Sequence, residues 1–336
     1  MVWLDNSRII AIFAVVVLHA AVSPVVDTPF GSTDWWAGNL INAFSRWCVP
    51  VFVMISGALL LSPARQESLG TFYRKRMSRV LWPFLFWSAF FLGWTLVKGI
   101  AKGKPPTPGL LALRFASGEP YYHLWFLYML IPLYLFVPFL RKVVAHATRR
   151  ELVVLTTMGF VLAALALIHS RLHAQSASFF PVWFLSYLPY FLLGHLIASD
   201  TRPVSPALAW SGFIGCSLLT AAGCYALASR AGLANGLYCY DYLSVTVIPM
   251  SASVMYLLKT WQRPLAGPGA TGRIAGLTMG VYLIHPLFLE ILQRVGLGPL
   301  DFHPAAAIPL AGLAVFGLSL TAAYLLDRLP VLRRTL

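Results

Sequence analysis

Residues 4–20 read LDNSRIIAIFAVVVLHA, an apolar run that carries Arg8 near its start and His19 near its end. Eleven residues of α-helix make close to three turns and rise about 16 Å, so the two side chains share one face of the helix. With Arg8 at the membrane boundary, His19 lies near the middle of the hydrocarbon core, where a polar group is costly and usually faces a protein cavity.

A simpler interpretation gives the pair no chemical role. Arg8 would only orient the helix, and His19 would only bond to a neighbouring helix. The shared face favours a functional site over this alternative.

The composition excludes a chain that is soluble throughout. Hydrophobic residues make up 59% of the 336 residues, charged residues 11%, and the mean hydropathy is +0.74. The net charge of +14 is explained by basic loops facing anionic lipid, so we expect the bilayer rather than nucleic acid as a partner. The four cysteines show no metal or redox spacing, and we predict no metal site.

The hydrophobic pattern predicts an all-α polytopic membrane protein, with residues 1–336 forming one transmembrane domain. Ten spans are expected, because each needs about 20 apolar residues or slightly fewer. With the N-terminus in the cytoplasm, 17 Lys and Arg lie inside and 7 outside, which favours N-in and C-in. The expected spans are 9–26, 40–61, 80–97, 122–140, 152–169, 179–198, 206–228, 243–258, 274–292 and 304–326.

A basic cluster, FYRKRMSRVLWP at residues 72–83, precedes the third span. Arg76 and Arg79 are three residues apart and adjacent on one helix face, and their guanidinium forks suit phosphate groups. The alternative is that the cluster only orients the helix. Together with Arg8, the pair predicts an anion site at the cytoplasmic boundary.

The second and fourth spans supply the remaining polar candidates. Asn42 and Arg46 lie towards the outer end of the second span, where Arg46 either snorkels or serves a site. Further along this span, Gly57 is expected to permit close helix packing. At the start of the fourth span, His123, Trp125 and Tyr128 lie at the outer interface, where Trp and Tyr ordinarily form an aromatic belt.

These residues and motifs resemble the acyltransferase 3 family of membrane acyltransferases. LDN with Arg8 and His19 is similar to its first helix, VPVFVMISGALL to its second, RKRMSRVLWP to its Arg-x-x-Arg motif, YHLWFLYMLIPLYLFVP to its Trp-Phe helix, and YLIHPLFL at 282–289 to a late helix. The resemblance runs in order from residue 4 to about 290. LDNSR, SRWCVP and YHLWF look closest to members that O-acetylate the enterobacterial common antigen. Ile9 replaces a Gly that many members have after the Arg, which bears on helix packing.

The resemblance implies transfer of an acyl group, commonly acetyl, from acyl-CoA to a hydroxyl of a cell-envelope glycan or lipid-linked saccharide at the bacterial inner membrane. Acetyl-CoA would be a substrate, with no tightly bound cofactor. His19 would act as general base or transient acyl carrier, with Arg46, His123 or a hydroxyl as oxyanion donor.

We assign acyl-CoA binding to Arg8, Arg76 and Arg79, and the acceptor side to Asn42, Trp125, Tyr128 and His285. Glu290 or Asp241 would orient a histidine, or simply lie at the surface. The oligomeric state stays open, a homo-oligomer included.

A transporter is the competing class. Ten spans, intramembrane ionisable groups and Pro-interrupted stretches such as FFPVWFLSYLPYFLLG at 179–194 all suit one. Against it, no matching pair of broken helices occurs in two halves, and the basic cluster lies at a surface rather than at the midplane.

Overall fold

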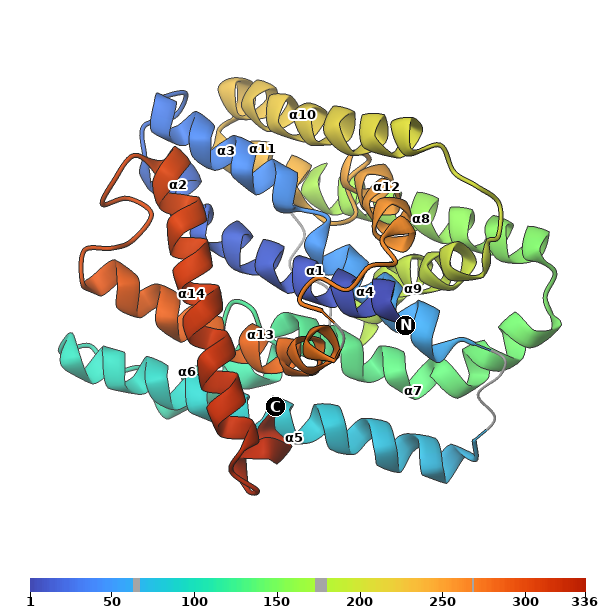
Figure 1. The fold of residues 1–336 in the computed structure, drawn as a ribbon. Helices are drawn as coiled ribbons and strands as arrows, with labels where there is room; N and C mark the ends of the chain where they lie inside the picture. Colours follow the sequence, from blue (N-terminus) through green and yellow to red (C-terminus); the bar gives the residue numbers. More distant parts are fainter. Residues whose placement is uncertain (63–66, 173–179, 268) are drawn as a thin grey trace.

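The computed structural model describes residues 1–62, 67–172, 180–267 and 269–336, without the side chain of Leu172 (Figure 1). Every regular element in these residues is a helix, as the sequence predicted. The α-helices are α1 Val2–Ala20, α2 Val22–Asp27, α3 Thr33–Ser45, α4 Cys48–Leu60, α5 Leu69–Ala101, α6 Pro108–Ala116, α7 Trp125–His146, α8 Arg149–Leu172, α9 Trp183–Ser199, α10 Pro206–Ala231, α11 Leu233–Gly236, α12 Val247–Thr260, α13 Ala270–Arg294 and α14 Pro304–Asp327; η1 Phe180–Val182, η2 Leu237–Tyr240 and η3 Leu332–Thr335 are 3₁₀-helices.

Within the described residues, nine helical stretches are long and apolar enough to cross a membrane. They correspond to nine of the ten expected spans. The remaining one, 243–258, is the shorter helix α12 of 14 residues. It begins only at Val247 because the preceding residues form a turn, in which the Asp241 carboxylate accepts a hydrogen bond from the backbone N–H of Leu243 at 2.9 Å. The all-α membrane fold is confirmed.

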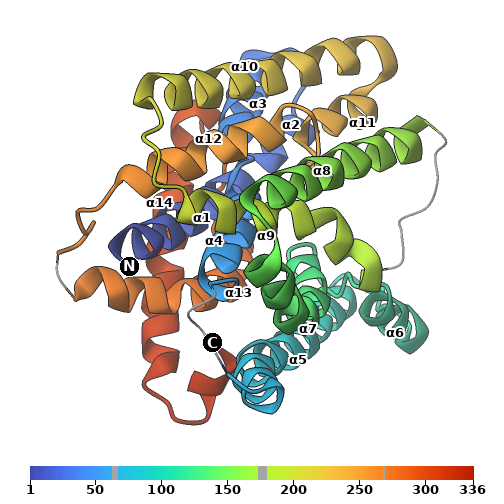
Figure 2. The same cartoon turned by 90° about the vertical axis from the view of Figure 1, so that its right-hand side faces the viewer.

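Helix α1 lies at the centre of the molecule and packs against α3, α4, α12, α13 and α14 (Figures 1 and 2). Its apolar side chains are buried on several faces, which is typical of a helix enclosed by other helices. Because α1 carries Arg8 and His19, the fold places the predicted pair inside the protein rather than against lipid.

The expected second span, 40–61, is divided into α3 and α4 by Arg46 and Trp47. Pro50 explains the break, because it has no N–H for the carbonyl of Arg46 and its ring crowds that carbonyl. Pro50 itself is tolerated in the first turn of α4. The break leaves Arg46 at the end of a helix, where its side chain can reach across to another segment.

Two glycines let α4 and α9 pack with their backbones in contact. A Cβ at Gly57 would lie 1.8 Å from the carbonyl oxygen of Phe191, and a Cβ at Gly194 would lie 2.0 Å from that of Met54. Any larger residue would push the two helices apart. This reciprocal contact confirms the packing role predicted for Gly57, since small residues let membrane helices approach closely.

We expect Gly57→Ala to lower the melting temperature of the detergent-purified protein by several degrees. Overpacking costs about 1–3 kcal/mol, and the obstacle here is rigid backbone. Gly93→Ala in α5 is the matched control, because a Cβ there meets no atom within 4 Å. Equal melting curves for Gly57→Ala and the wild type would show that α4 and α9 can move apart without loss of stability.

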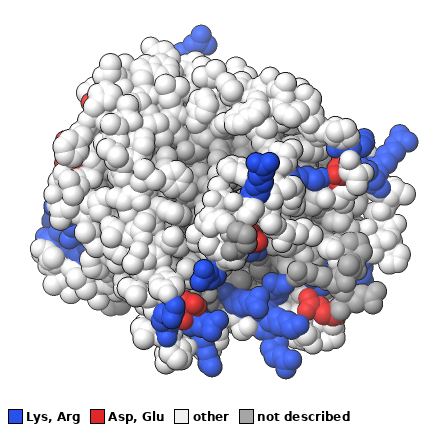
Figure 3. All heavy atoms as spheres, viewed as in Figure 1, with Lys and Arg blue, Asp and Glu red and all other residues white. Residues whose placement is uncertain are grey.

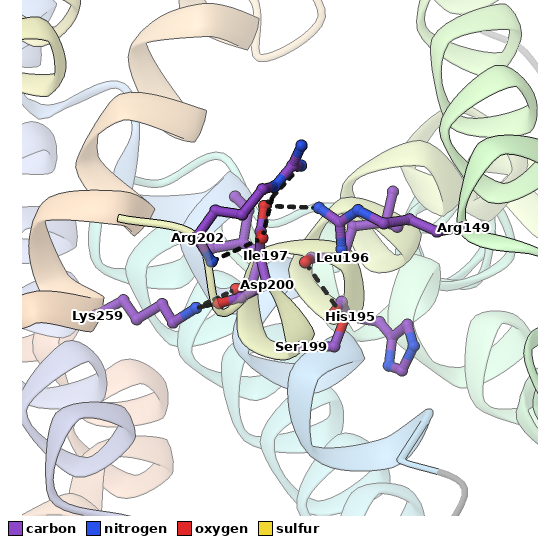
Figure 4. Close-up of polar contacts among 8 residues, drawn as sticks. All are labelled: Arg149, His195, Leu196, Ile197, Ser199, Asp200, Arg202 and Lys259. Atoms are coloured by element: carbon purple, nitrogen blue, oxygen red, sulfur yellow. Dashed lines mark hydrogen bonds and ion pairs between the residues drawn. The ribbon is translucent and has the colours of Figure 1, made fainter. Parts of the chain in front are cut away.

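A polar cluster around Asp200 joins three helices at the ends of α8, α9 and α12 (Figure 4). The Asp200 carboxylate pairs with Arg149 at 2.6 Å and with Arg202 at 3.0 Å, and these hydrogen bonds and charges lower its pKa to about 2. The ammonium group of Lys259 donates to the carbonyl oxygen of Ile197 at 2.6 Å, and to that of Asp200. The cluster satisfies the last carbonyls of α9.

The C-terminus lies beside α5 and α13 in the two views (Figures 1 and 2). Lys and Arg gather along the lower edge of the face in Figure 3, in the region of α5 and the C-terminus. Arg76 and Arg79 of α5 and Arg333 of η3 line one cavity with Arg8 of α1. The ends of α1 and α5 that carry these residues, and η3 after α14, therefore lie on the same side of the molecule.

We predict that this side faces the cytoplasm. A cysteine-free protein with Gly70→Cys, at the basic end of α5, should resist an impermeant thiol reagent added to intact cells, whereas Lys102→Cys, at the other end of the same helix, should react. Both positions are exposed, and a side chain at Gly70 meets no atom within 4 Å. Labelling of Gly70→Cys by reagent added outside the cells would show that the protein has the opposite orientation. Residues 63–66 of the expected 63–79 loop, including Arg65, lie outside the described residues, as does Phe179 of the sixth expected span.

Candidate active site

Six of the predicted residues line one cavity of about 560 Å³: Arg8 and His19 from α1, Arg76 and Arg79 from α5, His123 from the segment before α7, and Trp125 from the start of α7. The volume falls in the range of small-molecule sites. Arg8 and His19 mark its extent along α1, and the three helical turns between them give it a length of about 16 Å. The cavity therefore connects the basic boundary with the centre of the bundle.

The basic end of this cavity contains one arginine more than the three that the sequence predicted. Arg333, from η3 after α14, also lines it, and the Arg333 guanidinium pairs with Asp327 at 3.2 Å. Arg8 and Arg76 both lie close enough to the hydroxyl of Tyr134 to interact with it electrostatically. Asp5 also pairs with Arg8, at 3.8 Å. Four guanidinium groups against these two side-chain carboxylates leave this end positively charged, which suits a ligand with several anionic groups.

A second cavity, of about 1360 Å³, approaches His19 from the other end of α1. Its lining includes Val22 and Val26 of α2, and it contains the predicted residues Asn42 and Arg46. The two cavities share the same three lining residues, which are His19, Trp125 and Tyr242. The predicted histidine therefore lies where two spaces, one on each side along α1, come together.

Arg46 is held in place by three contacts on the second cavity. Its Nε donates to the side-chain oxygen of Asn42 at 2.6 Å, its Nη1 donates to the carbonyl of Tyr240 at 3.1 Å, and its guanidinium lies 4.4 Å from the Tyr240 ring centre. A guanidinium has five N–H groups, so others remain for a ligand. Arg46 also lies close enough to His19 to interact with it electrostatically.

His19 is bonded to a second histidine. Its Nδ1 lies 2.7 Å from Nε2 of His285 in α13, and the two rings lie edge to edge with centres 4.9 Å apart and planes 8° from parallel. The ring of Tyr122 packs edge-on against His19 at 5.1 Å. The imidazole of His19 is thus fixed on two sides while it lines both cavities.

His123 is almost fully buried, at 1% exposure, beside His285 and Tyr282. Neither ring nitrogen makes a hydrogen bond of normal geometry to the described residues, although the backbone of Leu283 is close enough to interact. Buried polar groups nearly always have partners, so His123 has capacity left for a ligand or a water in the first cavity.

Two residues predicted on the acceptor side lie elsewhere. Tyr128 lines neither of these two cavities; its hydroxyl donates to the carbonyl of Phe115 at 2.8 Å, and its ring packs on Phe84. His285 is fully buried behind His19 and also lines neither cavity. Tyr128 lies off the face of α7 that lines the first cavity, which Phe126, Leu130 and Tyr134 form at intervals of four residues. The contact with His19 withdraws His285 from the acceptor space.

The two carboxylates considered as histidine partners serve other groups. Glu290 accepts hydrogen bonds from Lys98 at 2.6 Å and Trp94 at 2.9 Å, and also from Tyr121. Asp241 lines the second cavity near Tyr242. In the described residues neither pairs with a histidine.

Sequence reasoning missed Tyr242 and Arg333. The signal for Tyr242 was the stretch YCYDYLS at 238–244, in which three tyrosines surround an aspartate directly before an apolar helix. Hydropathy assigns the end of this stretch to a span, and of its side chains only Asp241 stood out as a candidate. Arg333 was missed because it lies in a basic C-terminal segment, and the positive-inside rule alone accounts for such a segment.

The family model described as an acyltransferase domain, that of the acyltransferase 3 family, matches residues 1–328. The chain belongs to this family. It is therefore a membrane acyltransferase, and the match extends over nearly the whole chain. A search of the curated proteins and of the solved structures found no significant match.

Proposed function

We propose that this acyltransferase moves an acetyl group from cytoplasmic acetyl-CoA to a hydroxyl of a cell-envelope carbohydrate in the bacterial inner membrane, with His19 as the chemical residue. The observation that carries the proposal is the position of His19, which borders both cavities. A donor in one cavity and an acceptor in the other would meet at its imidazole. The resemblance to the enterobacterial common antigen O-acetyltransferases supports an envelope glycan, free or lipid-linked, as acceptor.

The first cavity suits the donor. Coenzyme A carries several phosphates on its nucleotide end and its thiol at the end of the long pantetheine arm. Arg8, Arg76 and Arg79 supply charge-assisted hydrogen bonds for phosphate at one end of the cavity. The rise of about 16 Å from Arg8 to His19 is comparable to the reach of the extended arm. A thioester held in this way would arrive at His19.

The chemistry at His19 balances without any other reactant. As general base, the imidazole takes the proton of the acceptor hydroxyl while the hydroxyl oxygen attacks the thioester carbonyl. The C–S bond then breaks, and the coenzyme A thiolate leaves and takes the proton back from the imidazolium. In the alternative route the imidazole itself attacks the thioester, the C–S bond breaks and the coenzyme A thiolate is released. The acceptor hydroxyl then attacks the acetyl-imidazole, the C–N bond breaks, and the thiolate takes the hydroxyl proton. Both routes need one ring nitrogen with a free lone pair.

Two groups are suited to stabilise the developing oxyanion. His123 lines the donor cavity with hydrogen-bonding capacity to spare, and Arg46 lines the acceptor cavity with N–H groups left over. The acceptor cavity adds Trp125, Trp183 and Tyr242 as flat apolar surfaces beside the polar side chains of Asn42 and Arg46. This mixture supports an acceptor with both ring faces and hydroxyl groups, as in a sugar.

Transfer of the radiolabelled acetyl group from acetyl-CoA by the purified protein in detergent is the direct test. Product should form on a crude envelope-glycan or lipid-linked saccharide fraction and depend on enzyme. A transporter would bind or move a substrate without breaking the thioester. Absence of any transfer or enzyme-dependent thioester cleavage, from a protein that is folded and binds acetyl-CoA, would reject the acetyl-CoA proposal.

Replacing Arg76 or Arg79 by Ala should weaken acetyl-CoA binding by about 1.5–3 kcal/mol, because each loses charge-assisted hydrogen bonds to phosphate. The effect should be larger at low salt, and Lys should restore only part of it. Calorimetric titration would measure it. The matched control is Arg74→Ala, an exposed arginine of the same helix that does not line the cavity. Equal affinity of the double Arg76→Ala, Arg79→Ala variant and the wild type would reduce the pair to topology determinants.

His19→Ala should lower turnover by roughly 10² to 10⁴, or more if the residue also carries the acetyl group. Folding and acetyl-CoA affinity should persist, because the phosphates are held about three turns away. Melting temperature, donor affinity and transfer rate would be compared with those of His195→Ala, a half-buried histidine of α9 outside both cavities. Near-normal turnover by well-folded His19→Ala protein would remove His19 from the mechanism.

A further inference from the structure

We infer that His285 is a positioning residue: it holds His19 in the single tautomer whose free lone pair is on Nε2. The inference deepens the proposed function and rests on it for its catalytic meaning. This role of His285 differs from the acceptor-side role that the sequence suggested. The positions of the hydrogen atoms are set along a chain of three groups that starts at the backbone of α13.

The first step fixes the hydrogen of His285. Its Nδ1 lies 2.7 Å from the carbonyl oxygen of Tyr282 and 3.2 Å from that of Val281. Carbonyl oxygens only accept hydrogen bonds, so Nδ1 must be the nitrogen that carries the hydrogen. A neutral imidazole has one N–H, and therefore Nε2 of His285 has a free lone pair.

Proline explains why the Tyr282 carbonyl can accept this bond. In a regular helix the carbonyl of Tyr282 would accept from the N–H of residue 286, but that residue is Pro286, which has no N–H. The carbonyl is left without its helical partner inside a membrane protein, where an unpaired carbonyl is costly. His285, next to the proline, supplies the missing donor from its ring.

The second step passes the constraint to His19. Its Nδ1 lies 2.7 Å from Nε2 of His285, a distance that requires one hydrogen between the two nitrogens. Because Nε2 of His285 has none, the hydrogen belongs to Nδ1 of His19. A doubly protonated His285 would place a charge on a ring with 0% exposure, and the described residues form no salt bridge to it.

The consequence is that Nε2 of His19 has a free lone pair and bonds to none of the described residues. This nitrogen is the one that either route of acetyl transfer requires. A catalytic base is commonly held by a third group that sets its tautomer and its orientation. The hydrogen bond lies nearly in the plane of both rings, which are 8° from parallel, and this geometry sets the orientation of His19. His285 therefore acts through His19 without touching substrate.

Three variants test the role through turnover. His285→Leu should lower kcat by roughly 10²-fold with the KM for acetyl-CoA unchanged, since the misplaced tautomer affects chemistry rather than phosphate binding. His285→Gln should retain more activity, because its amide oxygen can accept the hydrogen of His19. His195→Leu is the matched control. Wild-type kcat in folded His285→Leu protein would overturn the inference.

Pro286→Ala separates this role from a structural one. The new N–H competes for the Tyr282 carbonyl and should free the His285 ring, so kcat should fall. A proline that mattered only for helix shape would give a variant of equal or greater thermal stability with kcat unchanged, and this result would overturn the inference. Should His285→Leu fail to fold, Pro286→Ala and His285→Gln decide the question.

Nitrogen NMR of ring-labelled histidine measures the tautomer without any assay of activity. In the wild type His19, identified by loss of its signals in His19→Gln, should show a protonated Nδ1 and a bare Nε2; Pro286→Ala and His285→Leu should lose this single form. A protonated Nε2 in the wild type would overturn the inference. If acetyl transfer is never observed but the spectrum is as expected, the proposed function fails and the histidine geometry stands.

Discussion

The spacing between Arg8 and His19 is fixed by the geometry of the α-helix itself. Eleven residues of α1 place them about 16 Å apart on one face, and neither can move along the axis relative to the other. The other helices supply groups at the same two levels. Arg76, Arg79 and Arg333 gather at the level of Arg8, whereas His123, Trp125, Tyr242 and His285 gather around His19. The proposed separation between donor binding and chemistry therefore follows from the geometry of a single helix.

Prolines place functional groups in this bundle because the bilayer allows few other ways to interrupt a helix. Pro50 breaks the helix of the second span, and the break allows the Arg46 side chain to reach Tyr240 and Asn42. Pro286 leaves the helix unbroken but removes one donor, and His285 replaces it. In both places a local backbone defect gives a neighbouring polar side chain a position that a regular helix would not provide.

The sequence was sufficient for the fold class and for the residues near the start of α1 and α5. Hydropathy detects each span by itself, and helical periodicity relates Arg8 to His19 and Arg76 to Arg79 because those pairs are local. It could not place Tyr242, Arg333 or His285, because their positions depend on which helices pack together. Single-sequence patterns carry no such information, since the residues concerned are up to 325 positions apart. The length of α12 was missed for a different reason: a polar turn occupied residues that hydropathy counted as span.

The two cavities have the rings of His19, Trp125 and Tyr242 in common, and Trp125 and Tyr242 are stacked at 5.8 Å. A membrane protein with a cavity on each side of its centre has only the groups between the cavities to hold back ions. Aromatic rings at this point would oppose a leak of ions better than smaller side chains, because they fill more of the space where the two cavities come together. The rings that border the proposed chemistry are therefore also placed where they would preserve the electrical insulation of the membrane.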